Sequence, residues 1–196
     1  MRVIGGVYGG QRLTASSSSQ VRPTSDKVRE AVFDILEHRD WVRAGSVLKD
    51  ARVLDACCGT GALGIEALSR GAAHASFADN AQSSLRTTHG NLAGLSIPPE
   101  RFHLIRADIL KIPPAAQPCQ LIFLDPPYRQ DIPARVLPVL MRQGWLADGA
   151  MVVVETAALE TLPLPPGLEL RLDRRYGDTR IHIISLMQSE ETNKSL

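Results

Sequence analysis

From residue 51 onward, apolar segments of strand length alternate with segments whose apolar residues recur at helical spacing. We expect helices near residues 62–70, 81–93 and 131–143. We expect strands near residues 52–56, 74–78, 102–107, 120–125 and 150–155. Such an alternation predicts an α/β domain in which helices cover both faces of a mostly parallel sheet.

The two ends of the chain depart from this alternation. Residues 1–13 mix β-forming residues with paired glycines, which predicts a short hairpin. Apolar residues within 28–36 step by three and by one, which predicts a helix. Residues 168–175 and 180–187 flank the turn-rich residues 176–179, which predicts an antiparallel hairpin at the edge of the sheet.

The chain of 196 residues, 44% of them hydrophobic, is long and apolar enough for one domain with a full core. We expect an N-terminal extension over 1–45, a catalytic core over 46–188 and a disordered tail over 189–196. The three cysteines fit neither a disulfide framework nor a zinc site, and they indicate a reducing compartment. Because no apolar run approaches the roughly 20 residues that span a bilayer, and no signal sequence is visible, we expect a cytoplasmic protein.

The net charge of +1 conceals basic residues at both ends of the chain. Arg2, Arg12 and Arg22 lie near the start, and Arg174 and Arg175 lie near the end. Together they predict a surface that binds nucleic-acid phosphates. For any one of them, a solvated surface charge is the alternative.

The run Leu-Ile-Phe-Leu-Asp-Pro-Pro-Tyr, residues 121–128, places a carboxylate, two prolines and an aromatic ring directly after a buried strand. Asp125 therefore falls at the carboxyl end of the strand, where open α/β sheets bind their ligands. Pro126 and Pro127 stiffen the backbone and leave carbonyl acceptors, and Tyr128 offers a stacking face. This set suits a planar group with an amine, such as a nucleobase; a strand that stops at a Pro-Pro turn, with Asp125 as a cap, is the alternative.

Residues 59–64 read Gly-Thr-Gly-Ala-Leu-Gly and match G-x-G-x-x-G, a weak signal for a dinucleotide site. Asp79 stands at the distance where such sites carry an acid for the ribose, so the loop alone leaves an NAD site open. Asp55 favours S-adenosylmethionine instead, because its carboxylate would repel a pyrophosphate but could hold the ammonium of a methionine moiety. Asp108 ends the next strand and could accept from the adenine amino group.

Four acids thus end successive predicted strands, which helix caps alone explain poorly. A longer set of motifs accompanies them, in the segments Arg2–Gly6, Arg22–Glu30, Leu54–Asp55, Gly59–Ala72, Phe123–Tyr128 and Tyr176–Thr179. This combination resembles the RsmD family, the bacterial guanine-N2 methyltransferases of small-subunit ribosomal RNA. The sequence departs from the family at Ala56-Cys57-Cys58 and Thr60, and at Asp79 where Glu is usual, but it keeps small or apolar residues and the carboxylate.

The resemblance implies a class I, Rossmann-like methyltransferase fold: a seven-stranded, mostly parallel sheet whose last strand inserts antiparallel. It implies S-adenosylmethionine as cofactor and 16S rRNA in a partly assembled 30S subunit as substrate, with no metal and no membrane partner. We expect a monomer. The residues expected to bind the cofactor are Asp55, Cys57, Gly59, Thr60, Gly61, Asp79, Asn80, Asp108 and Ile109.

For the chemistry, our hypothesis is that Asp125 and the Pro126 carbonyl accept the hydrogens of the guanine amine and aim its lone pair at the methyl group. Tyr128 would stack on the base after it turns out of any helix. The nearest rival is an adenine-N6 DNA methyltransferase, since the same residues can present an adenine amine. A protein glutamine methyltransferase is a less favoured alternative, because such enzymes usually carry Asn in place of Asp125. A dinucleotide-dependent oxidoreductase would give residues 125–128 no task, and a non-catalytic ribosome assembly factor would not need the intact site.

Overall fold

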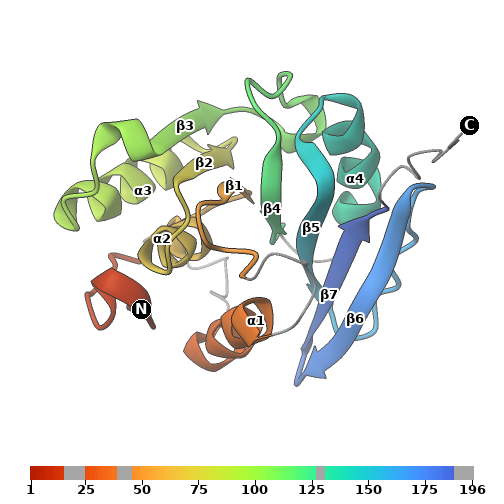
Figure 1. The fold of residues 1–196 in the computed structure, drawn as a ribbon, viewed down its shortest axis with the longest axis horizontal. Coiled ribbons are helices and arrows are strands. Elements are labelled where there is room, and N and C mark those ends of the chain that lie inside the picture. The colour runs from red at the N-terminus through yellow and green to blue at the C-terminus, as the bar shows by residue number, and fades with distance from the viewer. Residues whose placement is uncertain (16–24, 39–45, 127–130, 188–196) are drawn as a thin grey trace, which may run out of the picture.

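The computed structural model describes residues 1–15, 25–38, 46–126 and 131–187. Within them a single seven-stranded sheet has the order β3-β2-β1-β4-β5-β7-β6 (Figure 1). The strands are β1 (Arg52–Ala56), β2 (His74–Asp79), β3 (Phe102–Arg106), β4 (Cys119–Leu124), β5 (Leu146–Ala157), β6 (Leu168–Tyr176) and β7 (Thr179–Leu186).

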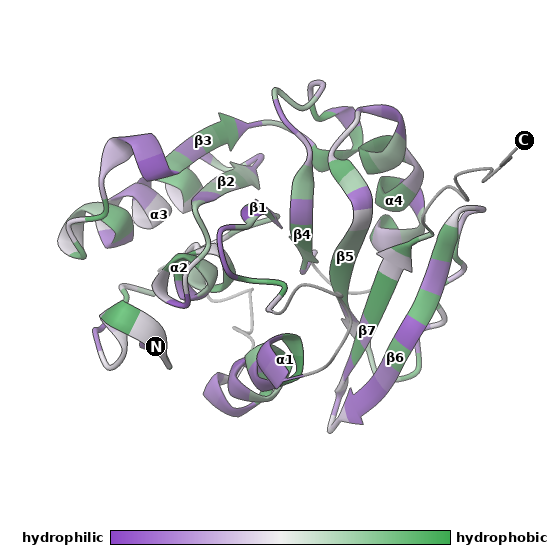
Figure 2. Cartoon of the chain, in the orientation of Figure 1, coloured by the Kyte–Doolittle hydropathy of each residue, from purple (hydrophilic) through white to green (hydrophobic). Residues whose placement is uncertain are grey.

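The first five strands pair in parallel, and β7 pairs antiparallel with both β5 and β6. The last strand therefore inserts into the sheet, as the resemblance implied, and leaves β6 at the edge. Figure 2 shows the difference in environment: β5 and β7 are largely green, whereas β6 alternates green and purple. An edge strand with one solvated face shows this alternation.

Helices cover both faces of the sheet and create two separate cores. The helices are α1 (Asp26–His38), α2 (Ala62–Ser69), α3 (Gln82–Gly94) and α4 (Ile132–Arg142). The first three pack on one face, where Phe33 of α1 meets Phe123 of β4 with ring centroids 5.4 Å apart. The fourth packs on the other face, with Leu137 and Leu140 against Ile122. The predicted α/β architecture is confirmed, and each helix and strand predicted from residue 28 onward lies within a few residues of its observed bounds.

The N-terminal hairpin was predicted only in outline. The chain reverses between Arg2 and Arg12, which form an isolated antiparallel bridge, but the turn between them is a 3₁₀ helix, Gly6–Tyr8, and no strand forms. The reason lies outside the segment: buried Glu66 of α2 accepts hydrogen bonds from the backbone N–H groups of Ile4, at 2.7 Å, and Gly5, at 2.8 Å. These two N–H groups are therefore not available to hydrogen-bond with a neighbouring strand.

Candidate active site

The glycine loop joins β1 to α2 in a tight turn. Gly59 and Gly61 have φ of +56° and +76°, in the left-handed region that glycine adopts without strain. Gly64 lies where α2 touches β2, and a Cβ there would come within 2.4 Å of Phe77 Cε1. At Gly59 a Cβ would meet nothing within 4 Å, so this part of the loop faces open space. Gly59 and Gly61 thus allow the tight turn, Gly64 allows α2 to pack closely on β2, and Gly59 leaves the loop open to a ligand.

Two side chains of α3 hydrogen-bond to backbone carbonyls of the glycine loop. Thr88 Oγ1 donates to the Gly59 carbonyl at 3.1 Å, and Asn91 Nδ2 donates to the Thr60 carbonyl at 2.9 Å. Asn91 also exchanges hydrogen bonds with Thr14, whose N–H donates to Asn91 Oδ1 at 2.8 Å. The same amide therefore fixes the loop and the end of the described N-terminal segment.

Asp55 is almost fully buried near the end of β1, with 2% of its surface exposed. Its Oδ2 accepts the Gly64 N–H at 2.8 Å, so it does cap the first turn of α2. Burial raises the pKa of Asp55 well above its usual range; the charges of Asp125 and Asp79 raise it further, and the hydrogen bond from Gly64 opposes them. A cation beside this carboxyl would favour its charged form.

Asp79 and Asp108 are held by backbone donors at the ends of the next two strands. Asp79 Oδ2 accepts the Gly59 N–H at 3.0 Å and Oδ1 accepts the Ala81 N–H at 2.8 Å. Asp108 is exposed and its Oδ1 accepts the Leu110 N–H at 3.0 Å. Asp108 is thus the N-cap of the 3₁₀ helix Ile109–Lys111, as the alternative held, whereas Asp79 binds the glycine loop and the residue before α3 and caps no helix. In both acids the carboxylate oxygens keep further lone pairs for a ligand. Of their neighbours, Asn80 is exposed and Ile109 is buried.

Cys57 directly follows β1, and the charges of all four acids act on its thiol. Burial raises its pKa to about 12, and the charges of Asp79, Asp125, Asp55 and Asp108 add to the effect. All four predicted carboxylates therefore act electrostatically on one thiol, which stays protonated and is unsuited to nucleophilic catalysis. The strand register gives the geometry: Ala56 pairs with both Ala78 and Leu124, so Asp79 and Asp125 follow at the ends of the strands on either side of Cys57.

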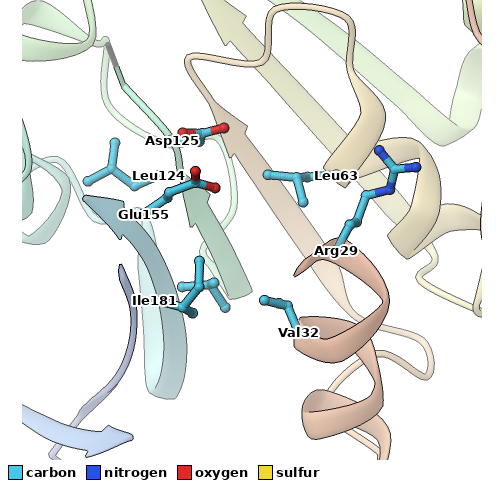
Figure 3. Close-up of a pocket in the computed structure, with 8 residues that line it drawn as sticks. Arg29, Val32, Leu63, Leu124, Asp125, Glu155 and Ile181 are labelled. Carbon is cyan, nitrogen blue, oxygen red and sulfur yellow. The ribbon is translucent and has the colours of Figure 1, made fainter. Parts of the chain in front are cut away.

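Asp125 follows β4 and lines a space of about 10 Å³ together with Arg29 of α1, Leu63 of α2 and Glu155 of β5 (Figure 3). Pro126 is buried beside it, whereas Pro127 and Tyr128 lie outside the described residues. Leu124 of β4 pairs with Val154 of β5, and Asp125 and Glu155 are the residues that come directly after this pair. The two acids are therefore neighbours on adjacent strands. The space is about the size of one water molecule.

Sequence reasoning missed Glu155 and Arg29, which are 6% and 1% exposed. Glu155 ends the apolar run of the strand predicted over 150–155, the signal that identified the other acids, although β5 itself continues to Ala157. Arg29 is hidden in the apolar stripe of α1; its Nη2 donates to Asp26 Oδ1 at 3.0 Å and to the Arg2 carbonyl. Burial lowers the pKa of Arg29, opposed by the charges of Asp26 and Glu66.

The arginines predicted to bind RNA lie in two separate places. Arg2 and Arg12 sit on the N-terminal bridge and are exposed, and Arg174 and Arg175 are exposed on β6. Figure 1 shows α1 between the N-terminal segment and β6. The structure therefore does not join the four into one patch, and Arg22 lies outside the described residues.

The described part of the chain contains no helix long and apolar enough to cross a membrane. Within the same residues, no group of three or more His, Cys, Asp and Glu side chains is arranged to hold a metal ion.

Several known proteins resemble this chain. A family model described as conserved hypothetical protein 95 matches residues 1–185. The Ribosomal RNA small subunit methyltransferase D of Escherichia coli (strain K12) is 34% identical over 167 residues, which cover 85% of this chain and 79% of that protein. The protein named "Putative rRNA methyltransferase YlbH" of Bacillus subtilis (strain 168) is 32% identical over 188 residues, with 93% and 97% covered.

Among solved structures, "Putative methyltransferase yhhF from Escherichia coli" superimposes with a TM-score of 0.79 at 30% identity, covering 96% of this chain and 99% of that one. A Haemophilus influenzae structure named "putative methylase HI0767" gives a TM-score of 0.77 at 24% identity, with the same coverage. These likenesses and the strand order confirm the class I methyltransferase fold. With a family model over nearly the whole chain and a relative 34% identical over most of it, the chain belongs to the RsmD family.

Proposed function

We propose that this protein transfers a methyl group from S-adenosylmethionine to the exocyclic N2 amine of a guanine in 16S rRNA, within an assembled or partly assembled 30S subunit. The observation that carries the proposal is the placement of Asp55, Asp79 and Asp125 at the carboxyl ends of three adjacent strands beside the glycine loop, where Asp55 accepts the Gly64 N–H and Asp79 accepts the Gly59 N–H. The names of the relatives, which include ribosomal RNA small subunit methyltransferase D, support the choice of RNA.

The residues present fit the cofactor through their donor and acceptor chemistry. Asp55 would hold the ammonium of the methionine moiety, Asp79 the ribose hydroxyls and Asp108 the adenine amino group. Gly59 leaves the loop open toward the ligand, since a Cβ there would touch nothing within 4 Å. When bound, the cofactor supplies a methyl group on a positively charged sulfur. The same site would be lined by the other residues expected to bind the cofactor. These are Cys57, Thr60 and Gly61 of the loop, Asn80 after β2 and Ile109 after β3.

Asp125 and the Pro126 carbonyl would act on the methyl acceptor. The guanine amine is a weak nucleophile because its lone pair is delocalised into the ring. Two acceptors that take its two hydrogens draw the nitrogen toward tetrahedral geometry and aim its lone pair, so that catalysis rests on positioning and electrostatics. The surplus proton leaves to Asp125 or to water. Tyr128, and Pro127 through the stiffness of the turn, complete the proposed pocket.

The experiment combines cofactor binding with turnover. Calorimetry should detect binding of S-adenosylmethionine but not of NAD, because the carboxylate of Asp55 would repel the pyrophosphate of NAD. Asp125→Ala should abolish methyl transfer to 30S particles while its affinity for S-adenosylmethionine stays within about threefold of that of the unchanged protein. Binding of NAD alone would favour the oxidoreductase, and substantial turnover by Asp125→Ala would refute the role of Asp125.

A further inference from the structure

A groove of about 530 Å³ lies between α3 and β3, at the edge of the sheet opposite to β6. Leu85 and Leu104 provide its apolar part, and Gln82, Arg86, His89 and Arg106 provide its polar part. Figure 1 shows α3 and β3 side by side at this edge, away from β6. The groove is separate from the space beside Asp125, with which it shares no lining residue.

The groove is basic and its charges are available. Among the described residues that line it there is no Asp or Glu. Arg86 and Arg106 are both exposed, and within the described part of the chain neither guanidinium takes part in a hydrogen bond or an ion pair. Arg175 and Arg180 of the β6–β7 hairpin differ in this respect, because Arg180 binds both oxygens of Asp173 at 2.6 Å and Arg175 donates to the Gly177 carbonyl at 2.8 Å.

The groove also adjoins the proposed site. The strand register pairs Arg106 with Asp79, the acid proposed to hold the ribose. From β3 to β4, which precedes Asp125, the sheet order counts three inter-strand steps. At about 4.8 Å a step this is on the order of 14 Å. A ligand that places one nucleotide at Asp125 can therefore reach the groove within a few nucleotides along the carboxyl edge of the sheet.

We infer that this groove binds phosphates of the RNA substrate. The inference rests on the proposed function and adds a contact surface that the sequence did not indicate. Guanidinium groups bind phosphate oxygens through paired N–H donors, and Gln82 and His89 supply further polar contacts. Leu104, which is partly buried at the surface of the groove, can pack against a sugar. Such contacts fix the position of the RNA but do not read its bases.

The test compares two double charge reversals in the full chain. Arg86→Glu with Arg106→Glu changes the groove. Lys49→Glu with Arg142→Glu is the matched control, since both residues are exposed and precede parallel strands, Lys49 before β1 and Arg142 at the end of α4 before β5. They therefore lie toward the amino ends of the strands, whereas Asp79 and Asp125 lie at the carboxyl ends. Binding of a 16S rRNA fragment is measured over a series of salt concentrations, and binding of S-adenosylmethionine is measured by calorimetry.

The groove variant should bind the fragment at least tenfold more weakly and reduce the slope of log affinity against log salt by about 1.4, because each phosphate contact with single-stranded RNA contributes about 0.7. Arg86→Glu alone, which leaves unchanged the Arg106 that pairs with Asp79, should give about half this change with an unaltered cofactor affinity. The control should match the unchanged protein.

The outcomes separate the two proposals. If the unchanged protein neither binds nor methylates RNA, the proposed function fails and the groove assignment fails with it. If it methylates RNA and the groove variant keeps the same salt slope, only the groove assignment is refuted. Loss of affinity for 30S particles with undiminished affinity for naked RNA would assign the groove to a ribosomal protein and overturn the inference.

Discussion

Asp55→Asn tests the ammonium site with little change of shape. The amide oxygen of Asn can still accept the Gly64 N–H, which donates to Asp55 at 2.8 Å, so α2 keeps its cap. What the variant loses is the negative charge. A hydrogen bond to a charged group contributes about 1.5–3 kcal/mol, and each 1.4 kcal/mol is about tenfold in affinity. Binding of S-adenosylmethionine should therefore weaken by about tenfold to about 150-fold.

The assay is calorimetry with two ligands. 5′-Methylthioadenosine carries the adenosine and the sulfur but no amino acid group, so its affinity should be the same for Asp55→Asn and the unchanged protein. Equal weakening toward both ligands would show that the substitution disturbs the loop. An unchanged affinity for S-adenosylmethionine would refute the role of Asp55.

The same substitution predicts a pH effect on the free protein. Burial raises the pKa of Asp55 in the folded state, whereas the unfolded chain loses that proton near pH 3.9. The folded state therefore holds the extra proton above that pH, and this group destabilises the protein progressively as pH rises toward its folded pKa. Asp55→Asn lacks this contribution, so its melting temperature should fall less between pH 5 and pH 8.

Three further predictions follow from packing and charge. Gly64→Ala should lower the free energy of unfolding by about 1–3 kcal/mol, because its Cβ would lie 2.4 Å from Phe77 Cε1, whereas Gly90→Ala, with open space at its Cβ, should not destabilise in the same urea titration. Glu66→Gln should cost about 3 kcal/mol in such a titration, since it leaves buried Arg29 and Arg70 without their shared carboxylate; a loss below about 1 kcal/mol would contradict this. Cys57 should react slowly with a thiol reagent at pH 7, because its pKa of about 12 keeps it protonated; rapid labelling would refute this.

The sequence predicts the elements of this fold because local pattern decides them. Strands buried on both faces read as continuous apolar runs, and the helices carry apolar residues at helical spacing. The N-terminal segment is different, because Glu66 lies 61 and 62 residues away from the donors that it binds. No local pattern in residues 1–13 reveals that contact.

For the site, position at a strand end is the signal that the sequence carries. It identifies Asp55, Asp79, Asp108 and Asp125, and the structure brings their charges to bear on one thiol. Applied to the fifth parallel strand, it would also have identified Glu155. Arg29 has no such signal, since a charged residue beside an apolar helical stripe usually faces solvent. The groove residues Arg86 and Arg106 come together only when α3 folds onto β3.

The most direct test of the central claim is methyl transfer from isotopically labelled S-adenosylmethionine to 30S particles, naked 16S rRNA and duplex DNA, followed by digestion to nucleosides. Our account predicts label in N2-methylguanosine from the 30S particles, with none in the DNA. Label in N6-methyl-2′-deoxyadenosine from the DNA would contradict this expectation and would establish the alternative, an adenine-N6 DNA methyltransferase, whose amine Asp125 and Pro126 could equally present.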